Sequence, residues 1–208
     1  MCSSDLFYYI TAMNENYQHP EMPAGSEEGI IKGLYKLKTG GKHKLKAQLL
    51  GSGTILREVE AAAEMLEKDW KVSADVWSAT SMNELVREGQ DVERYNRLNP
   101  LAEKKRSYVQ ACLDDEPGVV VAATDYIRLY AEQIRPWVRG SYTVLGTDGF
   151  GRSDTREALR SFFEVDRYHV VVATLNAMAD EGQIKHDVVA DAIKKYNINV
   201  DAVNPVKA

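Results

Sequence analysis

The stretch GVVVAA, residues 118–123, decides the fold. An unbroken apolar run of this length, entered through a glycine, is typical of a central parallel strand, because both faces of such a strand are buried. Neighbouring parallel strands must be joined by crossover connections, which are usually helices that cover the sheet. The run therefore predicts a domain of the α/β class.

Outward from this run, strands and helices alternate. Further strands are predicted at residues 47–50, 72–79 and 142–145, and a half-exposed strand within 29–38 is expected to pair antiparallel at one edge. Helices are predicted at 54–68, 102–113, 167–181 and 186–196. Three more helices are predicted to follow an N-cap residue: one after Thr80 or Ser81, one at 125–134 after Thr124, and one after Asp154. This order predicts a three-layer α/β domain with a mainly parallel sheet of about five strands.

Composition excludes several classes of protein. The 208 residues fit one globular domain, and 26 Lys and Arg against 31 Asp and Glu give a net charge of −5, which argues against a nucleic-acid partner. Two cysteines cannot build a disulfide framework or a Cys-rich zinc site. No run approaches the ~18–20 apolar residues of a membrane span, so we expect no membrane partner and a cytoplasmic protein.

The beginning of the chain has a different character. Residues 6–11 read as a buried strand, and residues 14–25 form a polar, proline-bearing stretch that predicts a linker. A strand that runs directly into a linker is typical of the last strand of an upstream unit. We therefore expect residues 1–26 to be the end of a preceding domain with its connector, and residues 27–208 to be the domain itself.

Two glycine-rich segments follow predicted strands, where open parallel sheets bind ligands. In the first, Gly51, Ser52 and Gly53 join a strand to a helix start that could hold an anion, but Leu56 replaces the third glycine of a dinucleotide fingerprint. A tight turn is favoured over a phosphate site, and a nicotinamide dehydrogenase is not supported.

The second segment, GTDGFGRSD at 146–154, has three glycines within six residues and carries polar groups for a contact with a partner or an anion. The candidate contact residues are Asp148, Gly149, Phe150, Gly151, Arg152, Ser153 and Asp154. In the purely structural alternative, Asp154 caps a helix, Arg152 pairs with a neighbouring acid and Phe150 is packed in the core or at an interface.

Other candidate sites are weaker. Asp125, Arg128 and Glu132 are spaced to form a solvated ion-pair face on one helix. The four histidines are scattered without ligand spacing, and neither the GxSxG nucleophile elbow nor the GK[ST] of a phosphate-binding loop occurs. Taken alone, the residues identify no catalyst.

Several long segments at consistent spacing resemble one family. They are NENYQHP, EEGIIKGLYKL, LLGSGTILREV, SATSMNEL, RYNRLNP, ATDYIRLYAEQIR, LGTDGFGRSDTREALRSFFEVD and DAVNPVKA. Together they resemble the C-terminal region of the homodimeric E1 component of bacterial pyruvate dehydrogenase, and LGTDGFGRSD followed by FFEVD is the most diagnostic piece.

The resemblance implies the C-terminal domain of a transketolase-type enzyme that uses thiamine diphosphate and Mg²⁺. Such an enzyme decarboxylates pyruvate and passes the acetyl unit to a lipoyl group of the E2 component, and upstream domains hold its cofactor across a dimer interface. The GDG anchor of the diphosphate is missing here, since residues 146–149 read GTDG. We therefore expect no catalytic, cofactor-binding or metal residue in this chain, and no activity from it alone.

The resemblance also implies partners and boundaries. The expected partners are a second copy of the enzyme, its upstream domains and E2, and residues 1–26 would end a pyrimidine-binding domain, so that the chain is the last quarter of a longer enzyme. The alternative that the residues leave open is a free-standing, non-catalytic α/β module that binds an anion at one of the two glycine-rich segments.

Overall fold

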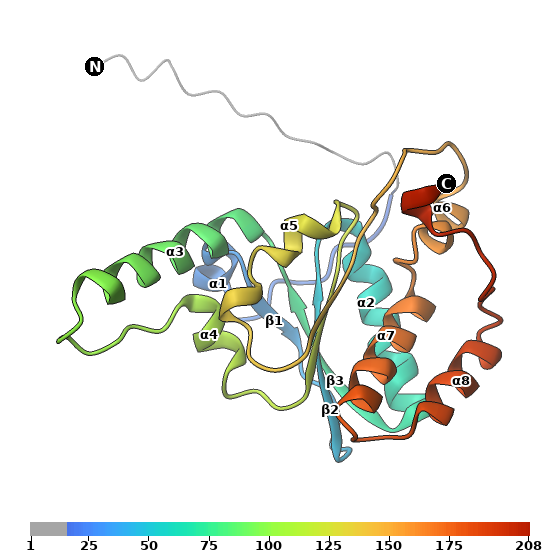
Figure 1. The fold of residues 1–208 in the computed structure, drawn as a ribbon, viewed down its shortest axis with the longest axis horizontal. Coiled ribbons are helices and arrows are strands. Elements are labelled where there is room, and N and C mark those ends of the chain that lie inside the picture. Colours follow the sequence, from blue (N-terminus) through green and yellow to red (C-terminus); the bar gives the residue numbers. More distant parts are fainter. Residues whose placement is uncertain (1–15) are drawn as a thin grey trace.

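The computed structural model describes residues 16–208, so the strand expected at 6–11 lies outside the described residues. It contains one five-stranded sheet in the order β1-β3-β2-β4-β5 (Figure 1). The strands are β1 (Tyr35–Lys38), β2 (Leu45–Gly51), β3 (Val72–Ser78), β4 (Val119–Ala123) and β5 (Tyr142–Leu145). β3, β2, β4 and β5 are parallel, and β1 pairs antiparallel with β3 at one edge, as the sequence predicts.

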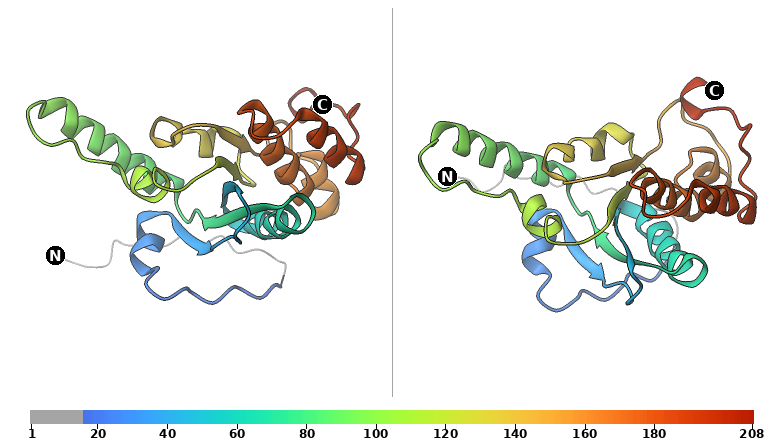
Figure 2. Two further views of the ribbon diagram at one scale, coloured as in Figure 1. Left: turned by 90° about the horizontal axis from the view of Figure 1, so that it is seen from below. Right: turned by 60° about the horizontal axis from the view of Figure 1, so that its bottom comes forward.

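Helices cover both faces of the sheet (Figures 1 and 2). One face carries α2 (Leu56–Met65), α7 (Arg167–Asp180) and α8 (His186–Lys195), and the other carries α1 (Glu27–Lys32), α3 (Met82–Leu98), α4 (Tyr108–Leu113) and α5 (Arg128–Glu132). α6 (Arg156–Phe162) follows the loop after β5. The predicted three-layer α/β domain is confirmed.

The two hydrophobic cores are separated by the sheet. Within β4, Val121 packs with the core beneath α2 and α7, whereas Val120 packs with the core beneath α3 and α5. Because consecutive side chains of a strand point to opposite faces, an all-apolar strand supplies both cores at once. Every residue of β4 is buried, which explains why this strand was the clearest feature of the sequence.

The half-exposed strand predicted within 29–38 is wrong in its first part. Residues Glu27–Lys32 form α1, and Gly33 ends that helix with a φ of +101°. Glu27 and Glu28 in the first turn and Lys32 in the last turn suit the helix dipole. Only Tyr35–Lys38 joins the sheet.

Two predicted helices are shorter than the sequence suggests. The helix expected at 102–113 begins at Tyr108, because the Asn96 side chain bonds both the N–H and the C=O of Lys105 and so holds the preceding segment out of a helix. The helix expected at 125–134 begins at Arg128, because the backbone before it is bonded to Thr147 instead.

The helix expected at 54–68 is divided into three parts. It starts with a 3₁₀ turn at Gly53–Ile55, continues as α2 and ends as a π-helix at Leu66–Trp70. Further 3₁₀ turns lie at Arg135–Trp137 and Pro205–Lys207. Within residues 16–208, no helix is both long and apolar enough to cross a membrane.

Candidate functional site

The carboxyl ends of β2, β4 and β5 bring together the segments singled out in the sequence. A cavity of about 290 Å³ lies there between the turn that precedes α2, Asp125 after β4, the loop after β5, and α6 with the residues that follow it. Its lining residues are Thr54, Ile55, Asp125, Thr147, Gly149, Gly151, Arg152, Arg156, Leu159, Arg160, Phe163 and Val165. We call this region the carboxyl edge.

The turn at Gly51, Ser52 and Gly53 is closed by the chain itself. The Ser52 N–H donates to the carbonyl of Ala123 at 3.1 Å, and Ser52 is buried. Gly53 has a φ of +58°, and a Cβ there would lie 3.1 Å from a carboxylate oxygen of Asp125. Because a carboxylate already stands beside this helix start, a second anion would be repelled. The contacts therefore favour the tight turn over an anion site.

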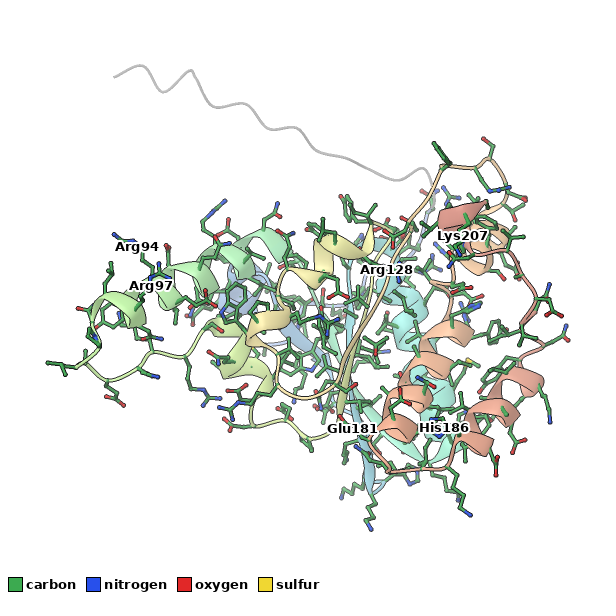
Figure 3. The ribbon with its side chains drawn as sticks, viewed as in Figure 1. Arg94, Arg97, Arg128, Glu181, His186 and Lys207 are labelled. Carbon is green, nitrogen blue, oxygen red and sulfur yellow. The ribbon has the colours of Figure 1, made fainter. Side chains whose placement is uncertain are left out.

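The ion-pair face predicted on residues 125–135 does not form as predicted. Asp148 accepts from the Arg128 backbone N–H at 3.1 Å and pairs with the Arg128 side chain. Glu132 pairs with Arg135 instead, with 2.6 Å between Nε and Oε2. Asp125 lies before the first residue of α5, so helical spacing does not apply to it. Arg128 and Asp148 thus join α5 to the loop after β5 (Figure 3).

The glycine-rich loop is shaped partly by the C-terminus. Gly149 has a φ of +108°, and a Cβ at this position would overlap the carbonyl oxygen of Pro205 in the last 3₁₀ turn. Asp154 is not the N-cap of α6: the Thr155 hydroxyl accepts from the Ala158 N–H at 3.3 Å, and Asp154 accepts from the Thr155 N–H at 2.7 Å. The glycine at 149 therefore permits a close backbone approach.

The centre of the loop is open to solvent. Phe150 is 81% exposed, and Ser153 is exposed as well. The Arg152 guanidinium lies 4.3 Å from the centre of the Phe162 ring, and it has no ion-pair partner among residues 16–208. Phe150 is therefore not packed in the core of the described residues, and Arg152 is not paired with an acid among them; packing of Phe150 at an interface stays a prediction.

Three more large side chains are exposed on the same carboxyl edge. Tyr126, Ile127 and Leu129 are 55%, 52% and 66% exposed at the start of α5, whose backbone is bonded to Thr147 of the loop. With Phe150 they form an apolar set that we call the edge patch. Large apolar side chains that stay exposed make this edge a candidate contact surface.

Sequence reasoning missed a buried charge cluster. Glu58 on α2 is 4% exposed and pairs with Arg160 at 3.2 Å and with Arg167 at 2.8 Å; it also accepts the Arg167 backbone N–H at 3.1 Å. Burial acts to raise the pKa of the Glu58 carboxyl, but the bonds and charge of the arginines hold this pKa below its usual value. No sequence signal links residues that lie about a hundred positions apart.

A second cavity, of about 1150 Å³, lies between α6, α7 and the chain after α8. Two of its acidic groups are paired within the chain: Glu58 with two arginines, and Asp166 with the ring of His169 at 2.8 Å. Among residues 16–208, no three His, Cys, Asp or Glu side chains gather as a metal site would require. No chemical step is assigned to the described residues.

Comparisons with known proteins give the family. Residues 33–166 match the model of the transketolase-like TK C-terminal domain. The pyruvate dehydrogenase E1 components of Cupriavidus necator and Pseudomonas aeruginosa are 57% and 59% identical over 204 residues, which cover 97% of this chain and 23% of each relative. A transketolase from Leishmania mexicana aligns over 72% of this chain and 18% of its own, with 20% identity and a TM-score of 0.49.

The chain thus spans less than a quarter of the length of the curated relatives it matches. Its segments align with the C-terminal portion of those proteins, and its mostly parallel five-stranded sheet has the architecture expected of that portion. The chain belongs to the family of transketolase-like C-terminal domains, in the form that occurs in pyruvate dehydrogenase E1 components.

Proposed function

We propose that this chain is the C-terminal domain of a cytoplasmic, thiamine diphosphate- and Mg²⁺-dependent pyruvate dehydrogenase E1 component. The parent enzyme would decarboxylate pyruvate and pass the acetyl unit to the lipoyl group of E2. The observation that carries this proposal is the identity of 57–59% over 97% of the chain with two E1 components. Residues 1–26 would then end the preceding pyrimidine-binding domain and connect it to residues 27–208.

Within that enzyme, we propose that the domain packs against its neighbours and supplies no reacting group. The exposed Phe150 and the unpaired Arg152 guanidinium favour a protein contact, because an aromatic side chain and an arginine are the residue types enriched at interfaces. The contact would be made by the glycine-rich loop, residues 148–154, with an upstream domain or the second subunit of a homodimer.

The activity is tested with the parent enzyme. Purified enzyme is supplied with thiamine diphosphate, Mg²⁺ and the lipoyl domain of E2, and acetylation of the lipoyl group is followed by mass spectrometry. Pyruvate is expected to be the preferred substrate, with 2-oxobutanoate and 2-oxoglutarate as comparisons. Preference for another 2-oxo acid, or acetylation that does not require thiamine diphosphate, would overturn the proposal.

The packing role is tested with Arg152→Ala and Phe150→Ser in the parent enzyme. Ile31→Ser on α1, where the side chain is 78% exposed, is the matched control. Lower activity or a weaker dimer is expected for the two loop variants and not for the control. If both loop variants keep the activity and the dimer dissociation constant of the parent, the contact role is wrong.

A further inference from the structure

The outer half of α3 and the segment that returns from it project away from the domain (Figures 1 and 2). We call residues 91–106 the α3 arm; Arg94 and Arg97 lie on it (Figure 3). Its inner end is firmly seated, because Gly89 of α3 packs on the Trp137 ring so closely that a Cβ would come within 2.6 Å of it. Every residue of the returning segment 99–106 is exposed.

The arm is held in one shape by its own contacts. Asn96 donates to the Lys105 carbonyl and accepts from the Lys105 N–H, both at 2.9 Å. Asn99 ends the helix by donating its side-chain amide to the Tyr95 carbonyl at 2.8 Å, and the Lys105 ammonium lies 3.7 Å from the centre of the Tyr95 ring. A projection that is already ordered loses little further conformational entropy when it binds a partner.

The tip of the arm is apolar. Leu98 is 58% exposed and Leu101 is fully exposed, so the tip buries almost no surface on its own domain. Charged residues of both signs lie near these leucines in the sequence, with Arg94, Arg97, Lys104 and Lys105 outnumbering Glu93 and Glu103. An apolar centre within a charged rim is the usual arrangement of a protein contact.

The charge of the arm differs from that of the rest of the chain. Residues 91–106 carry five Lys and Arg against three Asp and Glu, a net charge of +2, whereas the remaining residues carry −7. A basic projection on an acidic chain is electrostatically complementary to another copy of that chain.

The arm lies away from the first described residues of the chain. The first described residues lie beside α2, where the Tyr17 ring stacks against the Arg57 guanidinium at 4.7 Å. In Figure 1 the arm lies at the left end of the longest axis of the molecule, whereas α2 lies to the right of its centre.

From these observations we infer that the α3 arm is a subunit contact: Leu98 and Leu101 insert into an acidic-rimmed surface of a second copy of the enzyme. The inference rests on the proposed function in taking the parent enzyme to be a homodimer. It assigns to residues 91–106 a contact distinct from the carboxyl edge, which is reached by α5 and the glycine-rich loop.

The occupant is identified by cross-linking. Parent enzyme labelled with ¹⁵N is reassembled with unlabelled enzyme and treated with a lysine-reactive cross-linker, and cross-links from Lys104 and Lys105 are analysed by mass spectrometry. Mixed-isotope pairs are expected, because the arm would contact the other subunit. If these lysines give only same-isotope pairs, the arm contacts its own chain and the inference is wrong, while the proposed activity is unaffected.

A substitution test does not depend on reassembly. The double variant Leu98→Asp/Leu101→Asp is compared with Ile31→Asp, which places the same charge on another exposed apolar position. The dimer dissociation constant, measured by sedimentation, is expected to rise about tenfold or more for the arm variant, with an unchanged circular dichroism spectrum. Dissociation constants that match those of the control would overturn the inference.

Discussion

Glu58 links three helices through ion pairs. Its carboxylate is buried on α2 and holds Arg160 of α6 and Arg167 of α7, so one side chain fixes the positions of three helices. A buried carboxylate is stable only when its partners offset its desolvation, and here two guanidinium groups and a backbone N–H do so. The loop of residues 148–154 leads directly into α6, so this cluster also positions the loop.

Replacing Glu58 by Gln should lower the free energy of unfolding by about 2 kcal/mol at neutral pH, because both arginines lose their counter-charge. Chemical denaturation measures this loss. The control is Glu64→Gln, which removes an exposed carboxylate from the same helix. A Glu58 variant as stable as the control would contradict the structural role.

The same residue predicts a dependence on pH. The pKa of Glu58 is lower in the folded protein than the ordinary value of 4.5, so its stabilising contribution is present above about pH 4.5 and is lost as the pH falls through the folded pKa. The stability curves of the parent protein and of Glu58→Gln should therefore converge in acid. Curves that stay parallel down to pH 3 would show that Glu58 is not the group that titrates.

Gly118 provides a second test at this scale. Its φ is +102°, and a Cβ would overlap the carbonyl of Lys46 where β4 enters the sheet beside β2. Gly118→Ala should cost about 2 kcal/mol or more, because the strained φ and the overlap act together. Gly151→Ala is the matched control, since nothing lies within 4 Å of its Cβ position. Equal thermal midpoints for the two variants would contradict the argument.

At the scale of elements, α4 depends on its cap. It has only six residues, and the Ser107 hydroxyl accepts from the Gln110 N–H while the Gln110 side chain accepts from the Ser107 N–H. Ser107→Ala should lower the free energy of unfolding by about 1 kcal/mol, and Gln110→Ala should lower it less, because the hydroxyl bond remains possible. Urea denaturation of both variants checks the order; the reverse order would show that the reciprocal bond dominates.

The elements also show what sequence patterns can and cannot predict. β4 and β5 are where the pattern placed them, because an apolar run or a short β-branched segment has few other ways to bury itself. The helices at 102–113 and 125–134 are too long in the prediction, because Asn96 and Thr147 bond backbone groups that helical spacing would leave inside a helix. Such competing bonds join residues that the local pattern does not connect.

The candidate site was only partly predictable for the same reason. The glycine-rich segments were found from composition, and their place at the carboxyl ends of the strands followed from the fold class. Three features depend on tertiary contacts that the local sequence does not show. They are the Asp125 carboxylate beside Gly53, the close approach of Gly149 to the Pro205 carbonyl, and the pairing of Arg128 with Asp148. Local sequence therefore located the loops, and only the folded chain showed which residues each of them contacts.

At the scale of the whole molecule, two exposed surfaces lie on different parts of one domain. The edge patch lies at the carboxyl ends of the strands, and the α3 arm projects from the helical layer formed by α3 and α4. In the part of the chain that the structure describes, no three His, Cys, Asp or Glu side chains gather into one group. The central claim is that the domain packs within a larger enzyme and does not itself hold the cofactor.

That claim is tested most directly by the thermal midpoint of the 208-residue chain and of the parent enzyme, each with and without thiamine diphosphate and Mg²⁺. Ligands that bind only the folded state raise its midpoint. We predict a higher midpoint for the parent enzyme and no change for the 208-residue chain. A rise in the midpoint of the isolated chain that requires both thiamine diphosphate and Mg²⁺ would contradict the account.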